Sequence, residues 1–345
     1  MLIARRVWAI LLGLAASSLA CLAAADEIPT EGYRLGQGYP INSTGLRIGG
    51  YTSLHAEAPR NGPWRFELSD LSLFLTWQAN DRLRFFSELE AGDAFTATEG
   101  GRSGGHEARF ELERLYGDLL INGSATIRFG KFLTPVGRWN LLHADPLVWT
   151  STRPVATENL FSKHATGLML FGNLPLFERR LEYQVYADLT RSLDPHRSEN
   201  PFDNAAGVHA LYGLSERLQI GASYLSFELN ADRRRRQHLV GLEAIWRHHR
   251  YELSTEWVYR TPQDQGPSLW QGFAQGVAPI AGDWYAVGRY ELFEQRGDLG
   301  TGQAGVFGLA YRPLPPLVVK FEYRLGTHNQ QTAPDGFYTS FAVLF

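Results

Sequence analysis

The sequence predicts an all-β protein: a transmembrane antiparallel β-barrel of about 16 strands. Apolar and polar residues alternate over segments of about ten residues, and the connections between these segments alternate between short and long. The chain also ends in an amphipathic segment whose last residue is Phe345. No stretch of useful length has apolar residues at helical spacing.

Composition excludes two other classes of protein. The chain has 345 residues, a formal net charge of −3 and 44% hydrophobic residues. A helical membrane protein with many spans would need several apolar runs of about 20 residues, and the sequence has a single long run. The small net charge gives no support for nucleic-acid binding.

The single long apolar run lies at the N-terminus, where residues 1–25 are predicted to be a cleaved signal peptide. Two arginines precede the run, and Ala23-Ala24-Ala25 supplies a cleavage site of small residues. The alternative is a lipoprotein anchored at Cys21, but Ser18 stands where a lipobox normally has leucine. Cleavage would leave a chain without cysteine, so no disulfide is expected.

The alternating segments have the length of strands that cross a bilayer. The alternation is clearest in 70–78, 181–189, 251–260 and 317–325, where aliphatic and aromatic residues alternate with charged and polar ones. Strands of a soluble sandwich are about 5–6 residues long, whereas a tilted membrane strand needs about ten. Backbone groups in lipid must all be paired, so such strands require a closed sheet. The apolar side is therefore expected to face lipid and the charged side a water-filled interior.

The expected barrel spans residues 44–345, preceded by a short periplasmic N-terminal segment, residues 26–43. Short periplasmic turns and longer outer loops are expected to alternate, and the third outer loop, residues 134–165, is the longest. The strands are expected to begin near residues 45, 66, 83, 110, 125, 166, 180, 205, 217, 238, 250, 270, 283, 304, 316 and 336.

The last segment places Phe337, Thr339, Phe341, Val343 and Phe345 on one side. It resembles the C-terminal strand of Gram-negative outer-membrane proteins, which the barrel-assembly machinery recognises. The resemblance implies an outer-membrane location, contact with outer-membrane lipid and lipopolysaccharide, and recognition by that machinery through Phe345.

Residues 113–160 carry a resemblance to a family. Residues 113–140, ERLYGDLLINGSATIRFGKFLTPVGRWN, indicate a strand, an Asn-Gly turn and a second strand that leads into the long loop, and VVKFEYRLG at 318–326 is a further strand. The arrangement resembles the phosphate-selective-porin-type channels and their relatives. The resemblance implies an outer-membrane porin, a homotrimer, and a third outer loop that folds into the lumen as the constriction.

The charges of the lumen-facing residues depart from that family. Phosphate-selective members have a dense basic pore lining, whereas the lumen-facing set here carries both signs. A ring of one sign gives a strong ion filter, and a mixed lining gives a transverse field. We therefore expect passive diffusion of small hydrophilic solutes or ions, with a substrate-specific anion porin of the phosphate type as an alternative.

The long loop is expected to form the narrowest part of the pore. Its leucines and Trp149 are costly to leave in water, at about 25 cal/mol per Å², so we expect it to fold inward and face the wall made by the third to fifth strands. Both signs of charge are then expected at the constriction. The candidate residues are Arg138, Asp145, Arg153 and Glu158 from the loop, and Arg84, Glu88, Glu90, Arg128 and Lys131 from the wall.

A barrel enzyme of the lipase or protease type is the alternative from another class. It needs a nucleophile or an acid dyad beside a histidine, and His143-Ala144-Asp145 has no evident serine partner. No catalytic residue and no cofactor is assigned. A metal site built from His143, Asp145, Glu158 and His164 lacks strict ligand spacing, so no metal is assigned either. The basic run Arg233–Arg236 is expected in an outer loop, either solvated or bound to lipopolysaccharide phosphates.

Overall fold

The computed structural model describes residues 32–345, apart from 102, 106–107, 143, 159, 190–199, 265 and 296–299. Residues 35–345 form one compact unit, and of the residues before it only 32–34 are described. The predicted signal peptide, residues 1–25, therefore lies outside the described residues, as does the start of the predicted segment 26–43.

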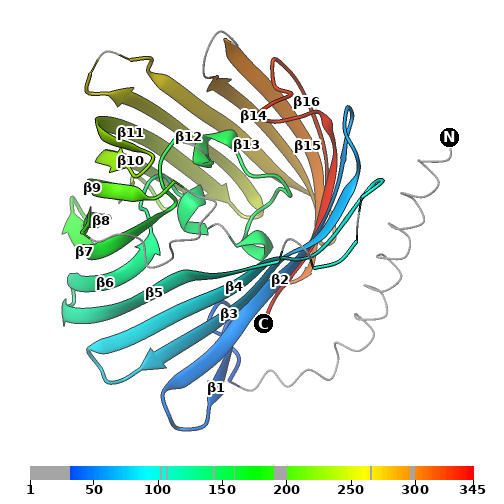
Figure 1. Cartoon of the computed structure of the whole chain (residues 1–345). Helices are drawn as coiled ribbons and strands as arrows, with labels where there is room; N and C mark the ends of the chain where they lie inside the picture. Colours follow the sequence, from blue (N-terminus) through cyan, green and yellow to red (C-terminus); the bar gives the residue numbers. More distant parts are fainter. Residues whose placement is uncertain are drawn as a thin grey trace. The chain divides into compact units, whose positions relative to one another are not determined.

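Strands β2 to β17 close into an antiparallel barrel of 16 strands, because β17 pairs with β2 (Figure 1). The predicted fold class is confirmed. The strands are β2 (Leu46–Pro59), β3 (Arg65–Gln78), β4 (Leu83–Thr98), β5 (Arg109–Asn122), β6 (Ala125–Leu133), β7 (His164–Leu176), β8 (Arg179–Asp188), β9 (Phe202–Gly213), β10 (Leu218–Leu229), β11 (Asp232–His248), β12 (Tyr251–Pro262), β13 (Leu269–Ala281), β14 (Trp284–Glu294), β15 (Thr301–Leu314), β16 (Leu317–Thr327) and β17 (Gly336–Leu344).

One strand begins well before the predicted position. Strand β11 starts at Asp232 rather than near residue 238, so the run Arg233–Arg236 belongs to a strand and not to an outer loop. Pairing between β10 and β11 continues, across an irregularity, as far as Leu229 opposite Asp232. The loop prediction was wrong because charged residues can extend a paired hairpin beyond the apolar band, where polarity does not mark the end of a strand.

A short strand that the sequence did not predict, β1 (Tyr39–Ile41), pairs with the start of β2. It lies on the edge of β2 next to the end of the chain, where Phe345 N donates to Gly50 O at 2.8 Å and Gly50 N donates to Phe345 O at 2.9 Å. Gly38 has a φ of +67°, and a Cβ there would lie 2.0 Å from the carbonyl oxygen of Ile48. A glycine is therefore required for this close approach.

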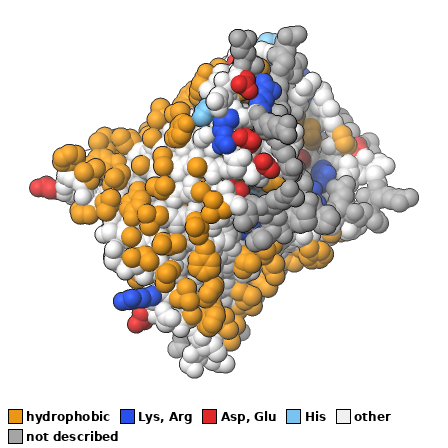
Figure 2. Space-filling model, turned by 60° about the vertical axis from the view of Figure 1, so that its left-hand side comes forward, with side chains coloured by type: hydrophobic (Ala, Val, Ile, Leu, Met, Phe, Trp, Pro, Cys, Tyr) orange, Lys and Arg blue, Asp and Glu red, His pale blue; other side chains and the backbone are white. Residues whose placement is uncertain are grey.

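Side-chain exposure separates the two faces of each strand as predicted. On β12, Leu253 and Tyr259 are 55% and 47% exposed on the outside, whereas Glu256 and Arg260 are buried on the inside. Figure 2 shows one face of the outer surface, on which hydrophobic side chains predominate. An apolar outer surface around a charged interior is the arrangement of a barrel in a bilayer.

In the part of the chain that the structure describes, no helix has the length and apolar character needed to cross a membrane.

The connection between β6 and β7 folds into the barrel (Figure 1) and contains three short 3-10 helices. Its apolar side chains pack on the inner wall. Trp139 and Val148 form a buried cluster with Phe273 of β13, and Val155 forms another with Phe293 of β14. This packing removes much of the loop's apolar surface from water, which is the reason the sequence predicted an inward fold, although Leu147 stays exposed. The 3-10 helices are η2 (Trp139–Leu142), η3 (Asp145–Leu147) and η4 (Val155–Thr157).

Candidate functional site: the interior loop and the cavity beside it

Carboxylates of the barrel wall bind the backbone of the interior loop. Glu256 on β12 accepts hydrogen bonds from the N–H groups of residues 138 and 139, at 3.1 and 2.8 Å. Glu322 on β16 accepts from the N–H groups of residues 151 and 152, at 2.9 and 3.0 Å. Glu291 on β14 accepts one more, at 2.7 Å. Five backbone N–H groups of the loop thus have acceptors on the wall, and together these bonds fix the loop in place.

Cations of the same wall bind the loop's carbonyl groups. Arg312 on β15 donates to the carbonyl oxygens of Pro146 and Val148, at 2.9 and 2.7 Å. Arg289 on β14 donates to the carbonyl oxygen of Thr152 at 3.0 Å. Wall side chains of both signs are therefore used to hold the loop in place.

Asp145 is the loop's own charged anchor. Its Oδ1 accepts from Lys320 Nζ at 2.8 Å and lies 3.6 Å from Nε2 of His55 on β2. Burial alone would raise the pKa of Asp145, but the neighbouring Lys320 and His55 outweigh it and hold the pKa well below its usual value. The carboxylate therefore stays charged at any ordinary pH.

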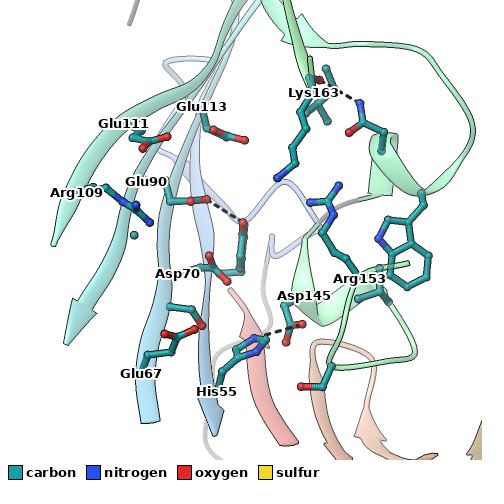
Figure 3. A pocket seen from close by; sticks show the side chains of 18 of the residues that line it. His55, Glu67, Asp70, Glu90, Arg109, Glu111, Glu113, Asp145, Arg153 and Lys163 are labelled. Atoms are coloured by element: carbon teal, nitrogen blue, oxygen red, sulfur yellow. Dashed lines mark hydrogen bonds and ion pairs between the residues drawn. The ribbon is translucent and has the colours of Figure 1, made fainter. Parts of the chain in front are cut away.

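A cavity of about 290 Å³ lies between the loop and the wall formed by β2 to β5. Figure 3 shows wall carboxylates on one side and loop side chains on the other. The acidic side chains of the wall are Glu67, Asp70, Glu90, Glu111 and Glu113, and the basic ones on the loop are Arg153 and Lys163. Arg109 of β5, His55 and His164 also line the cavity. Charges of opposite sign across a narrow space produce a transverse field.

The wall carboxylates differ in their partners. Glu67 pairs with Arg65, with Nε and Oε2 2.5 Å apart, and Glu113 pairs with His164 at 2.8 Å. The hydrogen bonds of Glu90 come instead from hydroxyls, Tyr51 Oη at 3.1 Å and Ser72 Oγ at 2.9 Å.

Asp70 likewise accepts from a hydroxyl, that of Ser53. Hydroxyl donors stabilise a carboxylate without neutralising it. In these contacts Asp70 and Glu90 therefore have hydroxyl donors and no cationic donor.

Arg153 faces this wall from the loop (Figure 3). Its Nε and Nη2 atoms are buried, and no described residue accepts a hydrogen bond from either of them. Two guanidinium nitrogens that are removed from water are expected to find partners, because the cost of desolvating them is otherwise not recovered.

Three of the residues that the sequence proposed for the constriction line the cavity, namely Glu90, Asp145 and Arg153. The wall arginines lie elsewhere: Arg84 and Arg128 both pair with Asp118, each at 2.7 Å.

The remaining candidates lie away from the cavity. Glu88 is fully buried and pairs with Arg114. Lys131 is also fully buried and donates to the carbonyl of residue 112. Arg138 lies near Arg247 of β11, and Glu158 is exposed. The residues that line the cavity include none of these four candidates.

Sequence reasoning missed most of the acidic wall. Alternation fixes which side a residue faces, but irregularities shift the pairing register between Leu68 and Asp70 and between Glu88 and Leu89. A bulge places two successive residues opposite one and changes the direction of the side chains that follow. Glu111 and Glu113, two residues apart, indicated an acidic patch on one side of their strand. Alternation alone does not give the position of that patch along the barrel axis.

The arrangement of the described residues does not support the hypothetical metal site. Asp145 is bound to Lys320, and His164 faces Glu113. Among the described residues, no group of three or more His, Cys, Asp and Glu side chains is placed to hold a metal ion. His143 lies outside the described residues.

Several solved structures share this architecture at low sequence identity. The outer membrane channel DcaP of Acinetobacter baumannii is 14% identical with a TM-score of 0.60, over 90% of this chain and 100% of that one. OmpF of Salmonella typhi, in complex with daunomycin, is 13% identical with a TM-score of 0.59, over 88% and 99%. The chain has the porin fold. The anion-selective porin from Comamonas acidovorans shares this fold, at 13% identity and a TM-score of 0.56 over 87% and 98%.

Sequence comparisons are less informative than the porin fold. No protein-family model matches the chain. An uncharacterized protein of Aquifex aeolicus (strain VF5) is 26% identical over an alignment 333 residues long, and the match covers 81% of this chain and 75% of that protein. The porin fold fits the outer membrane of a Gram-negative bacterium and is consistent with a channel, whereas the phosphate-selective family is not confirmed.

Proposed function

We propose that the protein is an outer-membrane channel for passive diffusion of small hydrophilic solutes and ions. The observation that carries this proposal is the fixed interior loop, which fills one side of the barrel and leaves a cavity of about 290 Å³ on the other. In this proposal the cavity is the constriction, and Glu90, Asp145 and Arg153 are among its lining residues. The mixed charges favour polar solutes over apolar ones, because a charged wall must be solvated.

The contacts of the two histidines at the cavity support a channel rather than an enzyme. His55 faces Asp145 and His164 faces Glu113. A hydrolase of the serine type would instead need a nucleophile held against its histidine base. An anion-specific porin of the phosphate type is also less well supported, because five carboxylates of β3 to β5 line the cavity.

Assembly and export form a second part of the proposal. Cleavage after residue 25 would release the chain for insertion, and Phe345, which pairs with Gly50 at the barrel seam, would be read by the barrel-assembly machinery. A homotrimer surrounded by lipid and lipopolysaccharide is proposed from the resemblance to porins. Deleting Phe345 should sharply lower the amount of protein in the outer membrane, and insertion at the wild-type level would contradict this role.

Single-channel recording in a planar bilayer tests the channel directly. The purified protein should give steady conductance steps, and removing residues 145–154 should raise the conductance because a constriction acts as a series resistance. A matched control removes residues 61–63, in the connection between β2 and β3, and should leave the conductance unchanged. Absence of any conductance from folded protein would contradict the proposal.

A further inference from the structure

Acidic side chains of the wall and a basic side chain of the loop face each other across the cavity. On the wall, the hydroxyl of Ser53 donates to Asp70, and the hydroxyls of Ser72 and Tyr51 donate to Glu90. On the loop, Arg153 has two buried nitrogens without an acceptor among the described residues. Figure 3 shows these groups on opposite sides of one space.

The loop cannot easily move to let Arg153 pair with the wall. Backbone N–H groups of residues 151 and 152 are bound by Glu322, and that of Val155 is bound by Glu291. Arg289 also holds the carbonyl of residue 152. The backbone of Arg153 therefore lies between anchored neighbours, so its position relative to the acidic wall is set by the fold.

A solute that carries both charges would satisfy both sides at once. An ammonium group can donate to Asp70 and Glu90, while a carboxylate can accept from the guanidinium of Arg153, a geometry that favours two parallel hydrogen bonds. The cavity, at about 290 Å³, has room for a solute the size of an amino acid.

We infer that the constriction selects dipolar solutes of the amino-acid class, with the ammonium group toward Asp70 and Glu90 and the carboxylate toward Arg153. The inference rests on the proposed function, since it names the solutes that the channel favours. A solute with a single charge meets one complementary side and one repulsive side: an anion faces the wall carboxylates, and a cation faces Arg153 and Lys163.

Three solutes of similar size separate these cases: 4-aminobutanoate, butanoate and butylammonium. Each is added to an open single channel, and its dissociation constant is obtained from the current fluctuations that it causes. We expect 4-aminobutanoate to bind at least about tenfold more tightly than either analogue, the effect of one additional complementary charge contact. Equal binding of all three solutes by a conducting channel would overturn the inference and leave the proposed function intact.

Two variants test which side of the cavity binds the carboxylate of the solute and which side binds its ammonium group. Arg153→Gln should abolish the preference for 4-aminobutanoate over butylammonium and keep the preference over butanoate. The double variant Asp70→Asn, Glu90→Gln should abolish the preference for 4-aminobutanoate over butanoate and keep the preference over butylammonium. Arg250→Gln removes a positive charge from the turn between β11 and β12, where Arg250 contacts Tyr285, and should change neither preference. Loss of both preferences in either cavity variant, with conductance retained, would contradict the orientation proposed here.

Discussion

The two sides of the barrel interior use charged side chains in different ways. On strands β12 to β16, wall charges such as Glu256, Glu322 and Lys320 are bound to the interior loop. On strands β3 to β5, acidic side chains such as Asp70 and Glu90 line a cavity and accept hydrogen bonds from hydroxyl groups of the wall. The charges of the first side hold the interior loop in place, and those of the second side line the cavity, where they can contact solvent and solute.

The difference shows that a charged lumen-facing residue is not by itself a pore residue. Backbone N–H and C=O groups of an irregular loop need partners when they are buried, and wall charges provide them. Side chains of the same type therefore serve structure on one side and solute contact on the other, depending on where the loop lies.

The largest expected effect comes from breaking the anchor at Asp145. Lys320→Met leaves a buried carboxylate without its ammonium partner, which typically destabilises a protein by about 3–5 kcal/mol. The temperature at which the folded band converts to the unfolded band in SDS gels should fall, and current noise should rise. The double variant Lys320→Met, Asp145→Asn removes both charges and should recover most of the loss. A single variant as stable as wild type would show that this ion pair does not hold the loop.

A smaller effect is expected from Gly137→Ala. A Cβ at this position would lie 2.2 Å from Oε2 of Glu256, and Gly137 has a φ of +63°. The substitution should displace Glu256 from the loop backbone and increase channel flicker. Gly282→Ala is the matched control, since Gly282 has a φ of +52° and nothing within 4 Å of the added Cβ. Equal flicker in both variants would mean that backbone strain, rather than contact with Glu256, causes the change.

On the cavity side, single neutralisations should change ion selectivity without changing stability. The wall acids outnumber Arg109, Arg153 and Lys163 around the cavity, so a potassium chloride gradient should give a reversal potential that favours the cation. Glu111→Gln should reduce this preference, and high salt should reduce it further by screening. A reversal potential that favours chloride would contradict the assignment of the acidic wall to the pore.

The smallest effect is expected from pH. Because the folded pKa of Asp145 is held below its usual value, its contribution to stability is fully present above the unfolded pKa of about 3.9 and is lost only as the pH falls through the folded value. Current noise should therefore stay constant between about pH 7 and pH 5. A rise in noise within that range would show that another titrating group controls the loop.

Most of the fold was predictable from the sequence, but only part of the site was. Alternation located the strands because burial on one face and lipid on the other impose a period of two. The inward loop followed from its apolar content, exemplified by Trp149. The pairing of Arg84 and Arg128 with Asp118 depends on strand register across three strands, which alternation does not specify. Lys163 was missed because no local pattern in a loop indicates which way its side chain points.

Accessibility of single cysteines tests the division of the interior most directly. The chain has one cysteine, Cys21, within the predicted signal peptide, so introduced cysteines should report alone. Glu111→Cys places a thiol on the cavity wall, and Val287→Cys places one on β14, in the cluster that packs against Trp149 of the loop. A charged methanethiosulfonate reagent should reduce the conductance of the Glu111→Cys channel and leave that of the Val287→Cys channel unchanged. Block of the Val287→Cys channel with no effect on Glu111→Cys would place the passage on the opposite side of the loop and contradict the account.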